Sequence, residues 1–111
     1  MAKTPEQRNI ASTHKEFVGQ NLAEARRAIG KKQIEMAAEL GIAPNKLNQW
    51  ESGLYYPDPW LLTRICDEYG FTMDWFYRRN RAGVAAGRAD DLRRVEAESA
   101  AAAGAGADWG S

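Results

Sequence analysis

The stretch Gln33–Trp50, QIEMAAELGIAPNKLNQW, constrains the fold of this chain more than any other part of it. Each half of the stretch has apolar residues at helical spacing. Gly41 separates the halves, and glycine tolerates the left-handed backbone with which helices commonly end. Pro44 then suits the first turn of a second helix, where its missing N–H is no loss. The pattern therefore predicts two short helices joined by a tight turn.

A small side chain lies where the two predicted helices must cross. Helices that cross steeply within a few residues need a small residue at their contact, and Ala37 meets that need. Ile42 fills the corner between the helices, and Leu47 and Trp50 give the second helix its own apolar stripe. Together with the turn glycine, these positions favour a helix-turn-helix over a generic helical hairpin whose stripe is only core.

This pattern resembles the helix-turn-helix of the phage-repressor, Cro-like family of regulators (the XRE family). The resemblance covers about Phe17–Tyr77, roughly half of the chain. It includes a Glu-x-Gly motif after the second helix (Glu51–Gly53), the following Pro57, and an arginine in the first helix, Arg26. In the family, this arginine and this glutamate form a buried ion pair.

The resemblance implies an all-α, compact five-helix bundle of the lambda-repressor-like DNA-binding type. We expect the helices at about 13–29, 33–40, 44–52, 58–70 and 72–77, with Asp58 and Thr72 as N-caps and Gly30 and Gly70 as helix ends. Thr13 and Glu16 have the spacing of a capping box, whereas Lys32 is a poor cap that should weaken the start of its helix.

The resemblance also implies a function. It predicts a sequence-specific transcriptional regulator, a repressor, that binds a palindromic operator in double-stranded DNA as a homodimer. Two alternatives use the same fold: a module that binds another protein, and an antitoxin that both represses its own promoter and binds a toxin.

Composition divides the 111 residues into three parts. Residues 1–12 are polar and predict a flexible arm, and residues 13–81 carry nearly all the large apolar side chains of the predicted domain. Residues 82–111 are rich in Ala, Gly and charge, so we expect a largely disordered tail, with a partly helical one as the alternative. Leu92 and Val95 are too few to hold such a helix against a core.

The charge balance is unusual for a nucleic-acid-binding protein, which is generally basic. The chain has 15 Lys and Arg residues and 15 Asp and Glu residues. Residues 14–81 have ten basic and nine acidic side chains, a net charge of +1, and residues 82–111 have three and five, a net charge of −2. Affinity for DNA must therefore come from the local placement of charge.

Other classes of protein find little support in the sequence. No run approaches the ~18 apolar residues that cross a bilayer, and no export leader opens the chain. The single cysteine, Cys66, cannot form an intrachain disulfide, which fits the cytoplasm. His14 is the only histidine, and no nucleophile–base pair or phosphate-binding glycine loop is evident. We expect no enzyme, cofactor, metal site or membrane contact.

The helix predicted at 44–52 is the candidate recognition helix. Leu47 marks the centre of its core face, with Trp50, Glu51 and Leu54 near it. Amide side chains dominate the opposite face, and amides can pair with the adenine edge in the major groove; an ordinary polar helix face is the alternative. The expected base-reading residues are Pro44, Asn45, Asn48 and Gln49, and the expected backbone contacts are Lys31, Lys32, Gln33, Lys46, Ser52 and Tyr55.

Aromatic side chains stand where the resembling family has other residues. Tyr55 and Tyr56 replace the basic residues that commonly hold the DNA backbone, so they serve phosphate contact, packing or a protein contact. Trp60 and Trp75 each fall opposite the core stripe of their own helix. We expect them, with Arg78, to form the dimer contact; the alternative is that Trp75 folds back under the tail.

Overall fold

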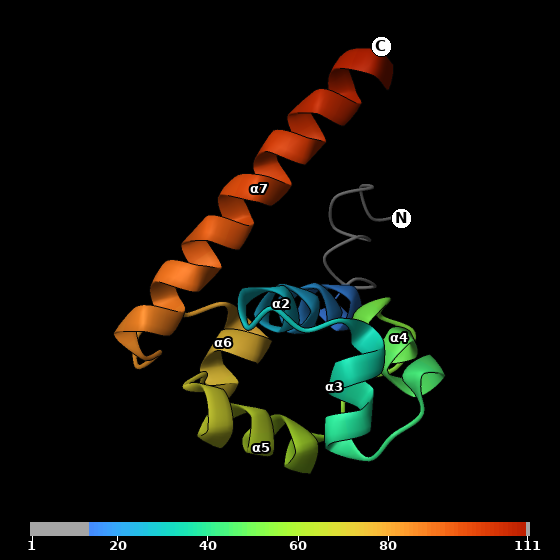
Figure 1. Cartoon of the computed structure of the whole chain (residues 1–111), viewed down its shortest axis with the longest axis vertical. Helices are drawn as coiled ribbons and strands as arrows, with labels where there is room; N and C mark the ends of the chain where they lie inside the picture. The colour runs from blue at the N-terminus through green and yellow to red at the C-terminus, as the bar shows by residue number, and fades with distance from the viewer. Residues whose placement is uncertain (1–13, 111) are drawn as a thin grey trace, which may run out of the picture.

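The computed structural model describes residues 14–110, apart from the side chains of residues 99 and 102–110. This part of the chain contains six helices and no strand, which confirms the all-α class (Figure 1). The helices are α2 (His14–Ala28), α3 (Gln33–Leu40), α4 (Pro44–Glu51), α5 (Pro59–Tyr69), α6 (Met73–Arg78) and α7 (Ala86–Gly110). The first five match the five predicted between residues 13 and 81. The predicted arm and Thr13 of the predicted capping box lie outside the described residues.

Helix α2 is the element around which the others pack, since it contacts α4, α6 and α7. The core beneath it draws on every helix. Its fully buried large side chains include Leu22, Met36, Leu47, Leu62, Ile65 and Phe76. Helix α3 packs on α4, and α5 packs on α6.

The turn between α3 and α4 has the form that the sequence predicts. Gly41 adopts a left-handed φ of 72°, and the N–H of Ile42 donates to the carbonyl of Ala37 at 3.0 Å. Ala37 is fully buried, as a contact residue between two crossing helices should be. The carboxylate of Glu35 accepts from the N–H of Lys32 at 2.7 Å, which offsets the missing side-chain cap at the start of α3.

The two other predicted caps are also present. The Asp58 carboxylate accepts from the N–H groups of Trp60 and Leu61, at 2.8 and 3.2 Å. The Thr72 hydroxyl accepts from the N–H of Trp75 at 3.1 Å. These bonds fix where α5 and α6 begin.

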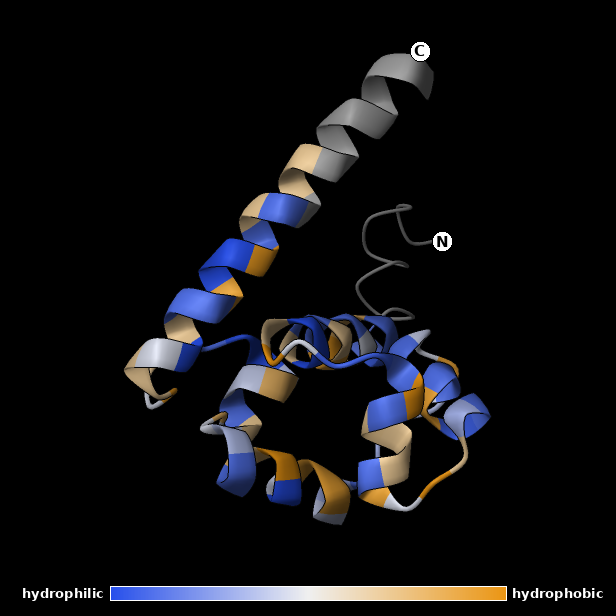
Figure 2. Cartoon of the chain, in the orientation of Figure 1, coloured by the Kyte–Doolittle hydropathy of each residue, from blue (hydrophilic) through white to orange (hydrophobic). Residues whose placement is uncertain are grey.

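The expectation that Leu92 and Val95 are too few to hold the tail against the core was wrong. Helix α7 projects from the bundle as a long rod, and in the part that Figure 2 colours, hydrophilic and apolar segments alternate (Figures 1 and 2). Two of its apolar side chains, Leu92 and Val95, are 0 % and 2 % exposed and belong to the core. They suffice because α7 packs against α2, and both side chains join the core that the other helices share.

The expectation that Trp75 is exposed was also wrong. Its side chain is fully buried, in the same cluster as Leu92 and Val95. The guanidinium of Arg79 lies 4.7 Å from the centre of its ring. Helix α6 packs against α2 and α5, and both Trp75 and Phe76 are fully buried. Of the two interpretations, the one in which Trp75 is buried describes the structure.

A partly buried polar cluster joins α2, the end of α6 and α7. Arg79 adopts a left-handed φ of 59° and donates to Glu24 at 2.6 Å and to Asn21 at 2.6 Å. Asn21 is fully buried and donates in turn to the carbonyl of Phe76 at 2.9 Å. Glu96 of α7 lies 3.4 Å from the Arg79 guanidinium. The cluster satisfies polar groups at the end of α6 while it holds α7 in place.

Candidate nucleic-acid interface

Helix α4 lies very close to α2. A Cβ atom at Gly19 of α2 would lie 2.7 Å from the carbonyl oxygen of Glu51, closer than real Cβ atoms come. Gly19 therefore lets the backbones of the two helices meet, a role that no sequence motif here revealed. Leu47 and Trp50 are 0 % and 4 % exposed, so they anchor the inner face of α4 in the core as predicted.

An ion pair fixes the C-terminal end of α4. The guanidinium of Arg26 donates to both oxygens of the Glu51 carboxylate, at 2.8 and 3.1 Å. It also donates to the carbonyl of Lys31, at 2.8 Å, at the start of the segment that leads into α3. The predicted pair of Arg26 and Glu51 is present, and it ties α2 to both helices of the helix-turn-helix.

Steric limits explain the glycine of the Glu-x-Gly motif. Gly53 has a φ of 84°, and a Cβ there would lie 2.8 Å from the backbone nitrogen of Glu16. Glycine thus permits the turn after α4 and its contact with the start of α2. Leu54, the next residue, is 57 % exposed and does not join the core face on which the helical projection placed it. The correction follows from α4 ending at Glu51, three residues earlier.

The predicted reading face of α4 is at the surface. Pro44, Asn45, Lys46, Asn48 and Ser52 are exposed, and Gln49 is half-buried. The ammonium of Lys46 lies 5.9 Å from the centre of the Trp50 ring. The Ser52 hydroxyl donates to the carbonyl of Gln49 at 3.2 Å, which leaves its oxygen as an acceptor.

Gln33 lies beside this face, but its side-chain amide is hydrogen-bonded to other residues of the protein. The amide nitrogen of Gln33 donates to the carboxylate of Glu51 at 2.9 Å and to the side-chain oxygen of Asn48 at 3.4 Å. The side chain from the start of α3 thus spans two positions, one turn apart, on α4.

The two lysines before α3 differ in their surroundings. Lys32 is exposed. The ammonium of Lys31 lies 2.7 Å from the carboxylate of Glu39, which also accepts a bond from the hydroxyl of Tyr69. The bond to Glu39 raises the pKa of Lys31, and the bond to Lys31 lowers the pKa of Glu39. Much of the charge of Lys31 is therefore balanced within the protein.

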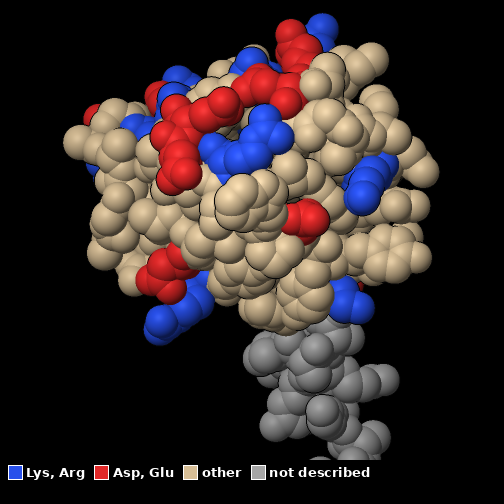
Figure 3. Space-filling model, turned by 90° about the horizontal axis from the view of Figure 1, so that it is seen from below, with Lys and Arg blue, Asp and Glu red and all other residues tan. Residues whose placement is uncertain are grey.

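Charge on the molecule is mixed rather than segregated. Figure 3 shows the face that is turned downward in Figure 1; acidic and basic side chains are neighbours on it, and much of it is uncharged. This distribution agrees with the overall balance of 15 basic and 15 acidic residues.

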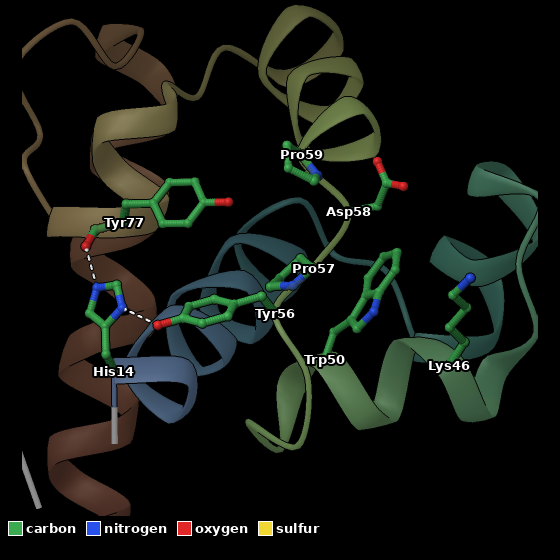
Figure 4. Close-up of a pocket in the computed structure, with 8 residues that line it drawn as sticks. All are labelled: His14, Lys46, Trp50, Tyr56, Pro57, Asp58, Pro59 and Tyr77. Atoms are coloured by element: carbon green, nitrogen blue, oxygen red, sulfur yellow. Dashed lines mark hydrogen bonds between the residues drawn. The ribbon is translucent and has the colours of Figure 1, made fainter. Parts of the chain in front are cut away.

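A groove of about 570 Å³ borders α4 on the side of the following loop (Figure 4). Its residues are His14, Lys46, Trp50, Tyr56, Pro57, Asp58, Pro59 and Tyr77. The Nε2–H of His14 donates to the carbonyl of Tyr77 at 3.3 Å, and its Nδ1 lies 2.7 Å from the Tyr56 hydroxyl. Tyr56 is thus tied to α2 and α6, whereas Tyr55 is 57 % exposed.

The three residues expected at a dimer contact differ in their exposure to solvent. Trp60 is 74 % exposed, and the side chain of Arg78 is 76 % exposed and lies 3.5 Å from Asp74. Trp75 is part of the core, so its side chain cannot contact a second copy of the chain.

Comparison with known families agrees with this geometry. A family model described as a helix-turn-helix domain matches residues 19–81, more than half of the chain. The chain belongs to the helix-turn-helix domain family. This helix-turn-helix domain includes α3 and α4 as the motif that gives the family its name, and such domains bind DNA in transcription regulators.

Comparisons with curated proteins and with solved structures found no match to this helix-turn-helix protein. Within residues 14–110, every helix is too short or too polar to traverse a lipid bilayer.

Proposed function

We propose that this protein is a sequence-specific transcriptional repressor of the Cro-like (XRE) type, which binds a palindromic operator as a homodimer. One observation carries the proposal: α4 buries Leu47 and Trp50 while an opposite face of amide and hydroxyl side chains stays at the surface. A helix held rigidly on one side and polar on the other is the form in which proteins read the major groove.

The proposed contacts fall into two groups. Asn45, Asn48 and Gln49 read base edges, with Pro44 at the start of the helix beside them. Lys32, Lys46, Ser52 and Tyr55 hold the phosphate backbone. Lys31 adds less charge to this group, because its ammonium is paired with Glu39. With few free cations, binding should depend less steeply on salt than for a strongly basic protein.

The proposed homodimer follows from the size of the reading surface. One helix-turn-helix domain contacts only a few base pairs, and two copies bind half-sites about one DNA turn apart. Trp60 is the most exposed large apolar side chain among the described residues, and Arg78 is also exposed. Exposed tryptophans are typical anchors of protein interfaces. We assign the dimer contact to the surface around Trp60.

A second function has an observation in its favour. Leu54, Tyr55, Tyr56 and Trp60 are between 43 % and 74 % exposed, and they lie in the loop after α4 and in the first turn of α5. Clustered exposed apolar side chains mark protein contacts, and the balanced charge suits such a contact. The alternative is therefore a protein-binding module or an antitoxin that uses this segment.

Binding to the DNA that flanks the gene, measured over a range of salt concentrations, tests the proposed function. A scrambled duplex of the same composition is the control. Tighter binding to the flanking DNA at every salt concentration is the expected result. Equal, weak binding to both duplexes would contradict it and favour the protein-binding alternative.

A further inference from the structure

His14, the first residue of α2, lines the groove beside α4 and bonds to two other parts of the fold (Figure 4). Its Nδ1 atom lies 2.7 Å from the hydroxyl of Tyr56, in the loop after α4. Its Nε2 atom lies 3.3 Å from the backbone carbonyl of Tyr77, in α6. Lys46 of α4 lines the same groove, so His14 and Tyr56 border the surface that faces DNA in the proposed function.

The chemistry of these groups fixes where the hydrogens lie when His14 is neutral. A carbonyl can only accept, so Nε2 carries the hydrogen that points to Tyr77. The Nδ1 atom of the neutral ring then has a lone pair and no hydrogen. The hydroxyl of Tyr56 must therefore donate to Nδ1. Its single hydrogen is used inside the protein, and it has none to offer to a phosphate oxygen, which only accepts.

Protonation of His14 reverses the bond to Tyr56. Both ring nitrogens of a charged histidine are donors, so Nδ1 then donates to the Tyr56 oxygen while Nε2 keeps its bond to Tyr77. The hydroxyl hydrogen of Tyr56 is released. His14 is exposed and Tyr56 is 43 % exposed, so this hydrogen can reach a group outside the protein. Protonation thus supplies a donor and a positive charge at the same place, and a phosphate group attracts both.

The charged groups around the pair favour an anion once His14 is protonated. The ammonium of Lys15 lies 5.8 Å from the centre of the Tyr56 ring, and Lys46 adds a second cation to the groove. Asp58 is the one carboxylate that lines the groove, and it already accepts from two N–H groups at the start of α5. Burial raises the pKa of Tyr77, so its hydroxyl adds no negative charge near neutral pH.

We propose that His14 and Tyr56 form a phosphate-binding site for the DNA backbone that becomes active when His14 is protonated. The inference rests on the DNA contact of the proposed function and adds a site beside it. Because every DNA sequence presents the same phosphates, the site adds affinity without a preference for sequence. DNA binding should therefore tighten as the pH falls from about 8 to about 5, the range in which histidine gains its proton.

The affinity of the full chain for DNA at about pH 5.5 and about pH 8 tests the inference. Selection from a library of random duplexes supplies the duplex that wild type enriches, and a scrambled duplex of the same composition is the comparison. The variants are His14→Gln, which stays polar without a charge, and Tyr56→Phe, which keeps the ring without the hydroxyl. Buffers free of phosphate make the DNA backbone the source of the phosphate groups.

From pH 8 to pH 5.5, wild type should gain about fivefold to tenfold in affinity relative to His14→Gln, on both duplexes. His14 is the single histidine of the chain, and the comparison cancels the pH response of all other groups. At pH 5.5 the salt dependence of wild type should exceed that of His14→Gln by about one unit of slope per domain bound. Tyr56→Phe should lose affinity at pH 5.5 and little at pH 8, because its hydroxyl hydrogen is free only at the lower pH.

The possible results separate the two proposals, once circular dichroism melts at both pH values establish that each protein is folded. A wild type that enriches no sequence yet shows the pH gain contradicts the proposed function and supports this inference. Enrichment of a sequence with the same pH response in wild type and His14→Gln overturns the inference alone. A wild type that binds neither duplex at either pH overturns both.

Discussion

Arg26 and Glu51, 25 residues apart in the sequence, form a two-bond ion pair with N–O distances of 2.8 and 3.1 Å. Their side chains are 13 % and 6 % exposed, so water screens the pair poorly. Planar guanidinium and carboxylate groups match in this geometry, which adds direction to the attraction. The pair holds α2 against the end of α4, next to the residues proposed to read DNA.

Removing the carboxylate should destabilise the fold. Glu51→Ala leaves the charge of Arg26 buried without its partner, and we expect the free energy of unfolding to fall by about 3 kcal/mol. Chemical denaturation measures it. Glu98→Ala is the control, because Glu98 is 69 % exposed and pairs loosely with Arg94 at 3.8 Å; its effect should be below about 1 kcal/mol. Equal stability of wild type and Glu51→Ala would show that the pair is absent in solution.

Helix α7 should contribute to the stability of the whole domain. Leu92→Ala removes a fully buried side chain, and we expect a loss of about 2–5 kcal/mol in unfolding free energy. The neighbouring Arg93→Ala changes a side chain that is 57 % exposed, and its effect should stay within about 1 kcal/mol. If both variants unfold at the same denaturant concentration as wild type, α7 does not pack on the bundle.

Self-association should depend on Trp60. In sedimentation across a concentration series, Trp60→Ala should weaken the dimer about tenfold or more, since exposed tryptophans often dominate interfaces. Ile34→Ala is matched as another exposed apolar residue, 63 % exposed on α3, and should leave the dimer unchanged. A wild type that stays monomeric at every concentration, with and without DNA, would refute the homodimer.

The thiol of Cys66 should react slowly in the folded protein. Burial, with a smaller contribution from the charge of Asp67, raises the pKa of Cys66 from 9.0 to about 11. Because the thiolate is the reactive form, alkylation at a pH near 8 should be roughly a hundredfold slower than in the unfolded chain, and it should accelerate up to about pH 11. Similar alkylation rates in native and denatured protein would mean that the packing of α5 on the bundle does not shield the Cys66 thiol.

Local rules account for the parts of the fold that the sequence predicted. Ala37 and Gly41 act on their immediate neighbours, and the caps at Asp58 and Thr72 bond to residues two or three positions away. Such requirements can be identified within a window of a few residues. The pair of Arg26 and Glu51 was predicted from resemblance, because no local pattern links residues so far apart.

Long-range contacts explain what the sequence did not predict. Helical periodicity placed Trp75 opposite the rest of its stripe, but it could not show that the packing of the helices buries this side chain completely. The bond between Arg79 and Glu24 joins residues 55 positions apart. Gly19 matters only because α4 passes against it. In each case the deciding partner comes from a distant segment, and composition gave no signal of it.

The central claim is that α4 reads DNA sequence through its amide face. Its most direct test is the affinity of wild type, Gln49→Ala and Lys46→Ala for the duplex that wild type enriches and for a random duplex, over a range of salt concentrations. Gln49→Ala should lose about 1–3 kcal/mol on the enriched duplex and little on the random one. Lys46→Ala should weaken both alike and reduce the salt slope by about one. Equal loss on both duplexes for Gln49→Ala would contradict sequence reading by this face.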